Sequence, residues 1–425
     1  MIQQKSSNIK LLTDYTPNNS FDAFPFGLYE CTPAAEIAMY YGFTSVHRLK
    51  PSDIDPEANQ IVDSLNSVFP CHESDQKLFN TKEKATLIKM YREGRFPSLP
   101  NPIMLYYEKP LTQQKSKSTY KHSCSIDIIG VEKSISEALV IQSSLAILED
   151  AGFSNLEVEI NNTGDDESRN RYESELKLYI KTSLGLMPDN MKDACRTDPY
   201  MLFSFNNTLA EKLQNNAPEP IAYLSDKNRK HFTEILEYLE GLGIAYSIKN
   251  NLLANRKVQS QTIFRIISKD LPSTNREIIS ARGMRYSALG RSLGFRKEIP
   301  AMGVYLSYIA PLSNRKKSLT KRINPNFCFV HLGFDARLKS LKIINDLRKK
   351  RIPLCHCLTR EKLTPQMSFA GKLNLPYMII IGQKEAAEGT VIVRSIENRS
   401  QETIPLTKLY DHLRKLKRRK TRVIV

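Results

Sequence analysis

The chain has 425 residues, of which 41% are hydrophobic and 25% charged, and this composition excludes an intrinsically disordered protein and favours two or more domains. No apolar run approaches the ~20 residues that span a bilayer, the N-terminal segment does not resemble a secretory signal, and the seven cysteines do not form a disulfide framework, so a cytoplasmic location is expected. The net charge of +17 is concentrated in residues 310–425, which hold 26 basic and 8 acidic residues, whereas the remaining 309 residues hold 36 and 37.

The elements predicted in the first three quarters of the chain are a mixture of helices and strands. Residues 136–153 have the pattern of an amphipathic helix, and the alternating run LEVEINN, 156–162, is typical of a half-buried strand. Residues 165–224 are polar and mainly helical in pattern, which indicates an inserted subdomain. A further helix is predicted over 225–243, where glycines end it.

The last quarter begins with a polar, charged linker, 313–325. Beyond it, the strand-like runs FCFVHL, IPLCHCL, YMIIIG and TVIVRSI alternate with helical patterns. This alternation predicts a small α/β domain over 326–412. A basic tail follows over 413–425.

Several segments are similar, in the same order, to segments of the histidyl-tRNA synthetases, a family of class II aminoacyl-tRNA synthetases. The run SEALVIQSSLAILEDAGFSNLEVEINNTGDDESRNRYESEL resembles the helix, strand and turn that follow motif 2. The run FVHLGFDARLKSLKIINDLRKKRIPL and the strands after it resemble the anticodon-binding domain. The run MYYGFTSVHRLKPSD resembles motif 1 more weakly, and PNPIMLYYEKP resembles the start of motif 2.

The resemblance implies an α+β fold. Residues 1–312 would form a class II synthetase-like catalytic core, with an antiparallel sheet flanked by helices and a helical insertion at about 165–224. Residues 326–412 would form the anticodon-binding-like α/β domain. The family also implies a homodimer that associates through the motif 1 region.

The catalytic groups of the family are replaced in each motif that can be aligned. Amino-acid activation brings a carboxylate onto the α-phosphate of ATP, so the site needs fixed cations, chiefly arginine. In this sequence, residues without a positive charge stand where the resemblance places the arginines of motif 2, of the Arg-Gly-Leu-Asp-Tyr-Tyr motif and of motif 3: Tyr106, Ala254 and Leu306. The remnants that match the family are Glu108, Arg285 and Tyr286.

The segment NTKEK, 80–84, stands near the position of the family's Arg-Pro-Glu-Gly-Thr. In that alignment Lys82 replaces the carboxylate that receives the substrate's amino group, which reverses the charge of the site. Together these losses predict that no catalytic residue remains. Cofactors are therefore not expected, and ATP and Mg²⁺ would be used only if the adenylation site were still active.

Two clusters of basic residues are predicted to bind RNA, which is the usual partner of a strongly basic domain. One is the loop after motif 2, and the other is the C-terminal tail, where phosphate contacts are favoured over base recognition. An exposed hairpin tip and a disordered tail are the alternatives. No metal site is expected, because Cys355, His356 and Cys357 are better explained as a strand than as ligands. The predicted RNA-binding residues are Lys115, Lys117, Lys121, Arg414, Lys415, Lys417, Arg418, Arg419, Lys420 and Arg422.

The function predicted from the sequence is that of a histidyl-tRNA synthetase-like protein, catalytically inactive, that binds tRNA or another structured RNA through its C-terminal domain. One alternative is an active histidine–tRNA ligase with an altered site. Another is a synthetase-like regulatory subunit of histidine biosynthesis. Since that regulatory relative generally lacks an anticodon-binding domain, the basic domain of this chain favours RNA binding.

Overall fold

The chain forms two compact units. The computed structural model describes residues 30–46, 55–68, 80–96, 99–108, 112–113, 119–253, 257–268, 279–311, 318–319 and 325–421. The first unit, here the C-terminal unit, comprises residues 1–48, 96–107 and 315–425, and the second, here the central unit, comprises 49–95 and 108–314. The C-terminal unit therefore combines the predicted α/β domain with segments from the first quarter of the chain.

The central unit is built on an antiparallel sheet. Its strands lie in the spatial order β5 (Thr119–Ile129), β10 (Ala301–Pro311), β9 (Ile279–Arg285), β8 (Thr262–Ser268), β6 (Leu156–Asn162) and β7 (Tyr246–Ile248), and β4 (Thr112–Gln113) pairs with β5. Of these pairs, β6–β7 is parallel. The strand predicted over residues 156–162 is present as β6, and its residues after Leu156 are buried.

Helices cover this sheet. Helix α5 (Ile135–Asp150) packs against β5 and β10, and it is buried from Ile135 to Leu148 because apolar and small residues surround its axis. Helix α9 (Asp226–Leu242) packs against α5 and ends at Gly243, whose φ of 69° is a conformation that favours glycine. The remaining helices near the sheet are α2 (Pro56–Val68), α4 (Thr81–Arg92) and α10 (Leu289–Ser292).

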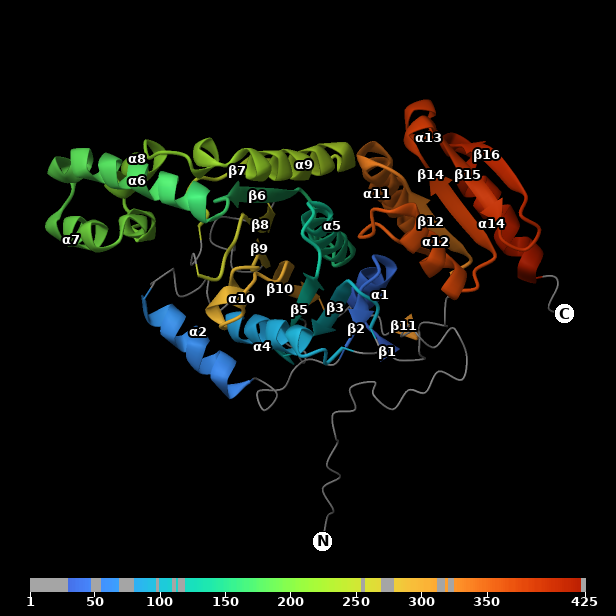
Figure 1. Ribbon diagram of the computed structural model, residues 1–425, viewed down its shortest axis with the longest axis horizontal. Helices are drawn as coiled ribbons and strands as arrows, with labels where there is room; N and C mark the ends of the chain where they lie inside the picture. Colours follow the sequence, from blue (N-terminus) through green and yellow to red (C-terminus); the bar gives the residue numbers. More distant parts are fainter. Residues whose placement is uncertain are drawn as a thin grey trace, which may run out of the picture. The chain divides into compact units, whose positions relative to one another are not determined.

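The insertion between β6 and α9 is helical, as predicted. Its elements are α6 (Asp166–Ser183), η3 (Leu184–Leu186), α7 (Asp189–Thr197), η4 (Pro199–Ser204), α8 (Thr208–Asn215) and η5 (Pro220–Tyr223). Helices α6, α7 and α8 lie together (Figure 1) and enclose their own apolar cluster, which includes Tyr172, Leu176 and Leu202. Asp165 begins α6 as its N-cap and accepts a hydrogen bond from the Ser168 backbone at 2.9 Å.

The C-terminal unit contains a five-stranded sheet. Its spatial order is β13 (Leu354–His356), β12 (Phe327–His331), β14 (Tyr377–Ile381), β15 (Thr390–Ser395) and β16 (Gln401–Pro405). Strand β12 is parallel to both of its neighbours, whereas the pairs β14–β15 and β15–β16 are antiparallel. Since β13 and β14 lie on opposite sides of β12, right-handed crossovers place the connecting helices on opposite faces of the sheet. The helices are α11 (Phe334–Lys349), α12 (Leu363–Lys372), α13 (Gln383–Glu388) and α14 (Leu406–Thr421).

The N-terminal segment of this unit packs against α11. It contains α1 (Pro33–Tyr40), the paired strands β2 (Thr44–Ser45) and β3 (Ile103–Glu108), and β1 (Glu30–Cys31), which pairs with β11 (Ser318–Leu319). The Tyr41 hydroxyl donates to Asn345 Oδ1 at 2.9 Å, and the Tyr40 hydroxyl donates to the Ile352 carbonyl at 3.0 Å. The segment that resembles motif 1 is therefore joined to the α/β domain by hydrogen bonds within one chain.

The observed architecture confirms the predicted α+β fold, with an antiparallel sheet core, a helical insertion and a C-terminal domain with its own sheet. Helix α14 continues into the segment predicted as a basic tail, as far as Thr421. Within the described ranges, the chain has no helix that combines the length and the apolar character needed to cross a membrane.

Candidate active site and RNA-binding surface

The candidate active site lies where β5, β10 and β9 run side by side in the central unit. The register pairs Gly303 of β10 with Asp127 of β5 on one side and with Met284 of β9 on the other. Leu306, three residues farther along β10, pairs with Cys124 and is fully buried. The position where the family resemblance places a phosphate-binding arginine is therefore occupied by an apolar core side chain.

Two glycines on β9 and β10, Gly283 and Gly303, are explained by close packing. A Cβ on Gly303 would lie 2.2 Å from Asp127 Oδ1, and a Cβ on Gly283 would lie 2.2 Å from the Phe264 ring. Both distances are far below van der Waals contact, so neither position accepts a side chain without displacing a buried neighbour. Side chains of this chain, rather than an open pocket, fill the space beside these glycines.

Asp127 is the centre of a buried polar cluster. Its Oδ2 accepts from Lys84 Nζ at 2.6 Å and its Oδ1 accepts from the Tyr286 hydroxyl at 2.8 Å. Lys84 Nζ also donates to Ser125 Oγ at 3.3 Å. The side chains of Lys84 and Asp127 are 0% exposed, so the two charges are fully withdrawn from water and compensate each other.

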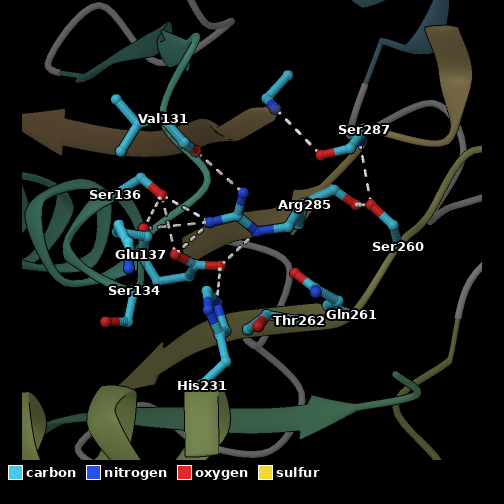
Figure 2. Close-up of polar contacts among 12 residues, drawn as sticks. Val131, Ser134, Ser136, Glu137, His231, Ser260, Gln261, Thr262, Arg285 and Ser287 are labelled. Carbon is cyan, nitrogen blue, oxygen red and sulfur yellow. Dashed lines mark hydrogen bonds and ion pairs between the residues drawn. The ribbon is translucent and has the colours of Figure 1, made fainter. Parts of the chain in front are cut away.

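Arg285, which matches the family motif, is bound by Glu137 of α5 (Figure 2). Its Nε and one terminal nitrogen donate to the two carboxylate oxygens of Glu137, each at 2.7 Å, in the two-pronged geometry typical of arginine. The guanidinium also donates to Ser136 Oγ at 2.7 Å and to the Val131 carbonyl at 3.1 Å. Its side chain is 2% exposed, so the guanidinium is engaged within the fold.

Glu137 is bound from a second side by His231 of α9, whose Nε2 lies 3.1 Å from Glu137 Oε1 (Figure 2). Burial raises the pKa of Glu137, but the charges of Arg285 and His231 and their hydrogen bonds outweigh that effect and hold the pKa at about 2. Glu137 is therefore a carboxylate at neutral pH, and it anchors α5 and α9 to the end of β9.

The other predicted active-site positions are also placed within the fold. Tyr106 is fully buried in β3, and Glu108, at the end of that strand, has its Oε2 3.5 Å from His122 Nε2. Lys82 lies on the outer side of α4, where its Nζ pairs with Asp63 at 2.8 Å. Ala254 lies outside the described residues.

The chemistry that this arrangement can support is limited by its internal pairing. Lys84 and Arg285, two of the cations that the central unit buries, are each bound to a buried carboxylate of the same unit. Electrostatic stabilisation of a phosphoryl or acyl transition state needs donors aimed at the reacting atoms. These two cations are instead directed at Asp127 and Glu137.

The predicted RNA-binding residues are only partly placed. Lys121 is exposed on β5, and Arg414 and Lys415 are exposed on α14. Lys417, Arg418, Arg419 and Lys420 lie on the helical backbone of α14, and Lys115, Lys117 and Arg422 lie outside the described residues. Tyr410 of α14 lies under Lys350, whose Nζ is 4.7 Å from the ring centroid, so this aromatic side chain contacts a cation of the chain itself.

The cysteines of the CHC run belong to a hydrophobic cluster. Cys355 and Cys357 pack with Cys328, Val330 and Met378 in the C-terminal unit, as expected for side chains on one face of a strand. Hydrogen bonding to Cys328 and burial raise the pKa of the Cys357 thiol far above its usual range. A thiol held in its protonated form is a poor nucleophile and a poor metal ligand.

Lys84, Asp127, Glu137 and His231 were not identified from the sequence. One signal was present: in CSIDIIG, 124–130, a carboxylate interrupts an otherwise apolar strand, and a buried charge of that kind requires a partner. The partner itself could not be named, because the four lysines of α4 and its flanks look alike in the sequence. Glu137 carries a similar signal, because it is the one charged residue of α5 before Glu149. His231 carries none, since it lies on a helix with many charged neighbours.

Comparisons with known proteins find similarity to an anticodon-binding domain and to histidine–tRNA ligases. Residues 308–416 match the family described as "Anticodon binding domain". The chain is 27% identical to the histidine–tRNA ligase of Clostridium kluyveri over 330 residues, 75% of this chain and 76% of that protein. It is also 27% identical to the histidine–tRNA ligase of Staphylococcus haemolyticus over 337 residues, 77% and 79% of the two chains. The solved apo histidyl-tRNA synthetase of S. aureus aligns over 89% of this chain and 93% of that one, with a TM-score of 0.44 and 20% identity.

Proposed function

Because the chain belongs to the histidyl-tRNA synthetase family, we propose that it binds tRNA, or an RNA with a tRNA-like structure, without activating an amino acid. The proposed loss of amino-acid activation rests on one observation, which is that Arg285 is bound to a carboxylate inside the fold. This motif cation is 2% exposed and donates to both oxygens of Glu137. A guanidinium bound in this way cannot turn to a phosphate without leaving the buried Glu137 with His231 in place of its two-pronged arginine partner.

Leu306 supports the same conclusion from a second motif. It is fully buried within β10, at the position that the resemblance assigns to the arginine of motif 3. A leucine offers no donor to a phosphate oxygen, and loss of a single stabilising donor costs on the order of 100-fold or more in rate. ATP and Mg²⁺ are accordingly not expected to bind as they do in an active synthetase.

The RNA-binding half of the proposal rests on the C-terminal unit. Residues 308–416 match an anticodon-binding domain, and residues 310–425 hold 26 basic and 8 acidic residues. Because counterion release from phosphates dominates the affinity of such surfaces, binding is expected to weaken steeply with salt. Because tRNA is the proposed partner, we also propose that the protein is located in the cytoplasm.

We also propose that the protein is a homodimer that associates through the motif 1-like region, as the family resemblance implies. Helix α1 of that region donates hydrogen bonds to the α/β domain through Tyr40, and Tyr41 beside it does the same. Light scattering coupled to gel filtration measures the mass directly. A single species near 48.6 kDa, the mass of one chain, would contradict a dimer.

Two assays on the same preparation test the main proposal. The first is ATP–pyrophosphate exchange with each of the twenty amino acids, with the histidine–tRNA ligase of S. haemolyticus as the positive control. No exchange above an enzyme-free blank is expected. The second is binding of unfractionated tRNA at 50 mM salt, where saturable binding is expected. Histidine-dependent exchange would instead support the active ligase, and absence of tRNA binding would refute the RNA half.

A further inference from the structure

Helix α4 carries lysines on two opposite sides. Lys82 and Lys89 are seven residues apart and therefore share one face, where they pair with Asp63 and Asp55. Lys84 is two residues beyond Lys82, about 200° around the helix axis, and its side chain points into the unit. Only Lys84 of these three is fully withdrawn from solvent.

The group that receives the Lys84 ammonium is rigidly built. Asp127 Oδ2 and Ser125 Oγ lie 2.6 Å and 3.3 Å from Lys84 Nζ, on alternate residues of β5. The Tyr286 hydroxyl fixes the other oxygen of Asp127 at 2.8 Å. Gly303, opposite Asp127 in the sheet, has no room for a Cβ beside that carboxylate. The acceptors are thus fixed by three strands or strand ends and do not depend on α4.

The chemistry of these acceptors suits a primary ammonium group. An ammonium has three donors and no acceptor, and a carboxylate with a neighbouring hydroxyl supplies the lone pairs it needs. A buried carboxylate without a cation would be strongly unfavourable.

We propose that Asp127, Ser125 and Tyr286 form a socket for a primary ammonium group, and that Lys84 is its built-in ligand. The Lys84 ammonium occupies the place that the amino group of a free amine would otherwise take, and it closes this part of the sheet to amino acids. This inference deepens the proposed loss of amino-acid activation and rests on it for its functional meaning. The occupancy of the socket can be tested independently.

Chemical rescue tests the socket. The substitution Lys84→Ala removes the atoms of an n-propylammonium ion, so the melting temperature of the full-length variant is measured with n-propylammonium chloride, sodium chloride or tetramethylammonium chloride. At about ten times the dissociation constant, n-propylammonium is expected to raise the melting temperature by roughly 3 to 6 °C more than the other salts. The wild-type protein and Lys82→Ala are expected to show no such difference. Equal responses of Lys84→Ala and the wild type would overturn the proposal.

A second measurement uses the wild-type protein and so does not depend on the folding of a variant. The chain is acetylated briefly with an N-hydroxysuccinimide ester, and the modified lysines are identified by mass spectrometry. Lys84 is expected to react at least ~100-fold more slowly than Lys82, because its ammonium is buried and paired. Comparable rates at the two lysines would overturn the proposal. Neither measurement involves RNA or ATP, so their failure is distinguishable from failure of the proposed function.

Discussion

The salt dependence of RNA binding should change when the exposed cations of α14 are removed. Leu409 and Leu413 of this helix are buried, whereas Arg414 and Lys415 are exposed on its outer side. The double substitution Arg414→Gln/Lys415→Gln therefore removes two charges without removing a core residue. Truncation before Leu413 would not have this advantage.

The size of the effect follows from the number of phosphate contacts. Each contact contributes roughly 0.7 to 0.9 to the slope of log affinity against log salt, so two contacts contribute about 1.4 to 1.8. Between 50 and 200 mM salt, the variant is thus expected to lose about tenfold less affinity for tRNA than the wild type loses. At 50 mM salt the variant should bind more weakly than the wild type.

Fluorescence anisotropy with labelled, unfractionated tRNA over this salt range measures the slope. The matched control is Lys372→Gln/Lys384→Gln, which removes two exposed lysines from α12 and α13 of the same unit. The control is expected to leave the slope close to that of the wild type. An unchanged slope in the α14 variant, or an equal decrease in the control, would refute the assignment of α14 as a phosphate-binding helix.

Three further predictions concern the stability of the central unit, and each is tested by measuring the free energy of unfolding in urea. Arg285→Met should lower the free energy of unfolding by about 3–5 kcal/mol, because it leaves Glu137 buried without its cation; a loss below about 1 kcal/mol would contradict the central role of this pair. The pKa of Glu137, about 2, lies below the usual 4.5 of a glutamate. The ionised Glu137 therefore contributes its full stabilisation, about 3 kcal/mol, above about pH 4.5, and this contribution is lost as the pH falls toward 2. The free energy of unfolding of Glu137→Gln should accordingly change less steeply with pH between 5 and 3 than that of the wild type, and an unaltered slope would contradict this account. Gly303→Ala should lower the free energy of unfolding by about 1–3 kcal/mol, because its Cβ would overlap Asp127 Oδ1. The control is Gly371→Ala in α12, where a Cβ meets no atom within 4 Å. This variant should leave the free energy of unfolding unchanged or raise it by up to about 1 kcal/mol.

The sequence by itself determined the elements and their class. Helix α5, strand β6, helix α9 and the helical insertion were predicted from local sequence patterns, and the family resemblance placed them in an α+β fold. The amphipathic pattern predicted for α5 was wrong, because this helix is buried on all sides from Ile135 to Leu148. Apolar periodicity is a local property, and burial of one face rewards the same period in the folded chain. The basic last quarter was equally readable, because net charge does not depend on conformation.

Only the tertiary structure decided how the polar residues are paired. Arg285 and Glu137 are 148 residues apart, and Lys84 and Asp127 are 43 apart. The sequence favoured Lys82 as the lysine that alters the amino-group site, but the rotation of α4 on the sheet places Lys82 at the surface and Lys84 in the interior. The retained arginine looked like a remnant of a substrate site until its partner from α5 was seen. Long-range pairing of this kind depends on the packing of whole elements, and no local pattern encodes it.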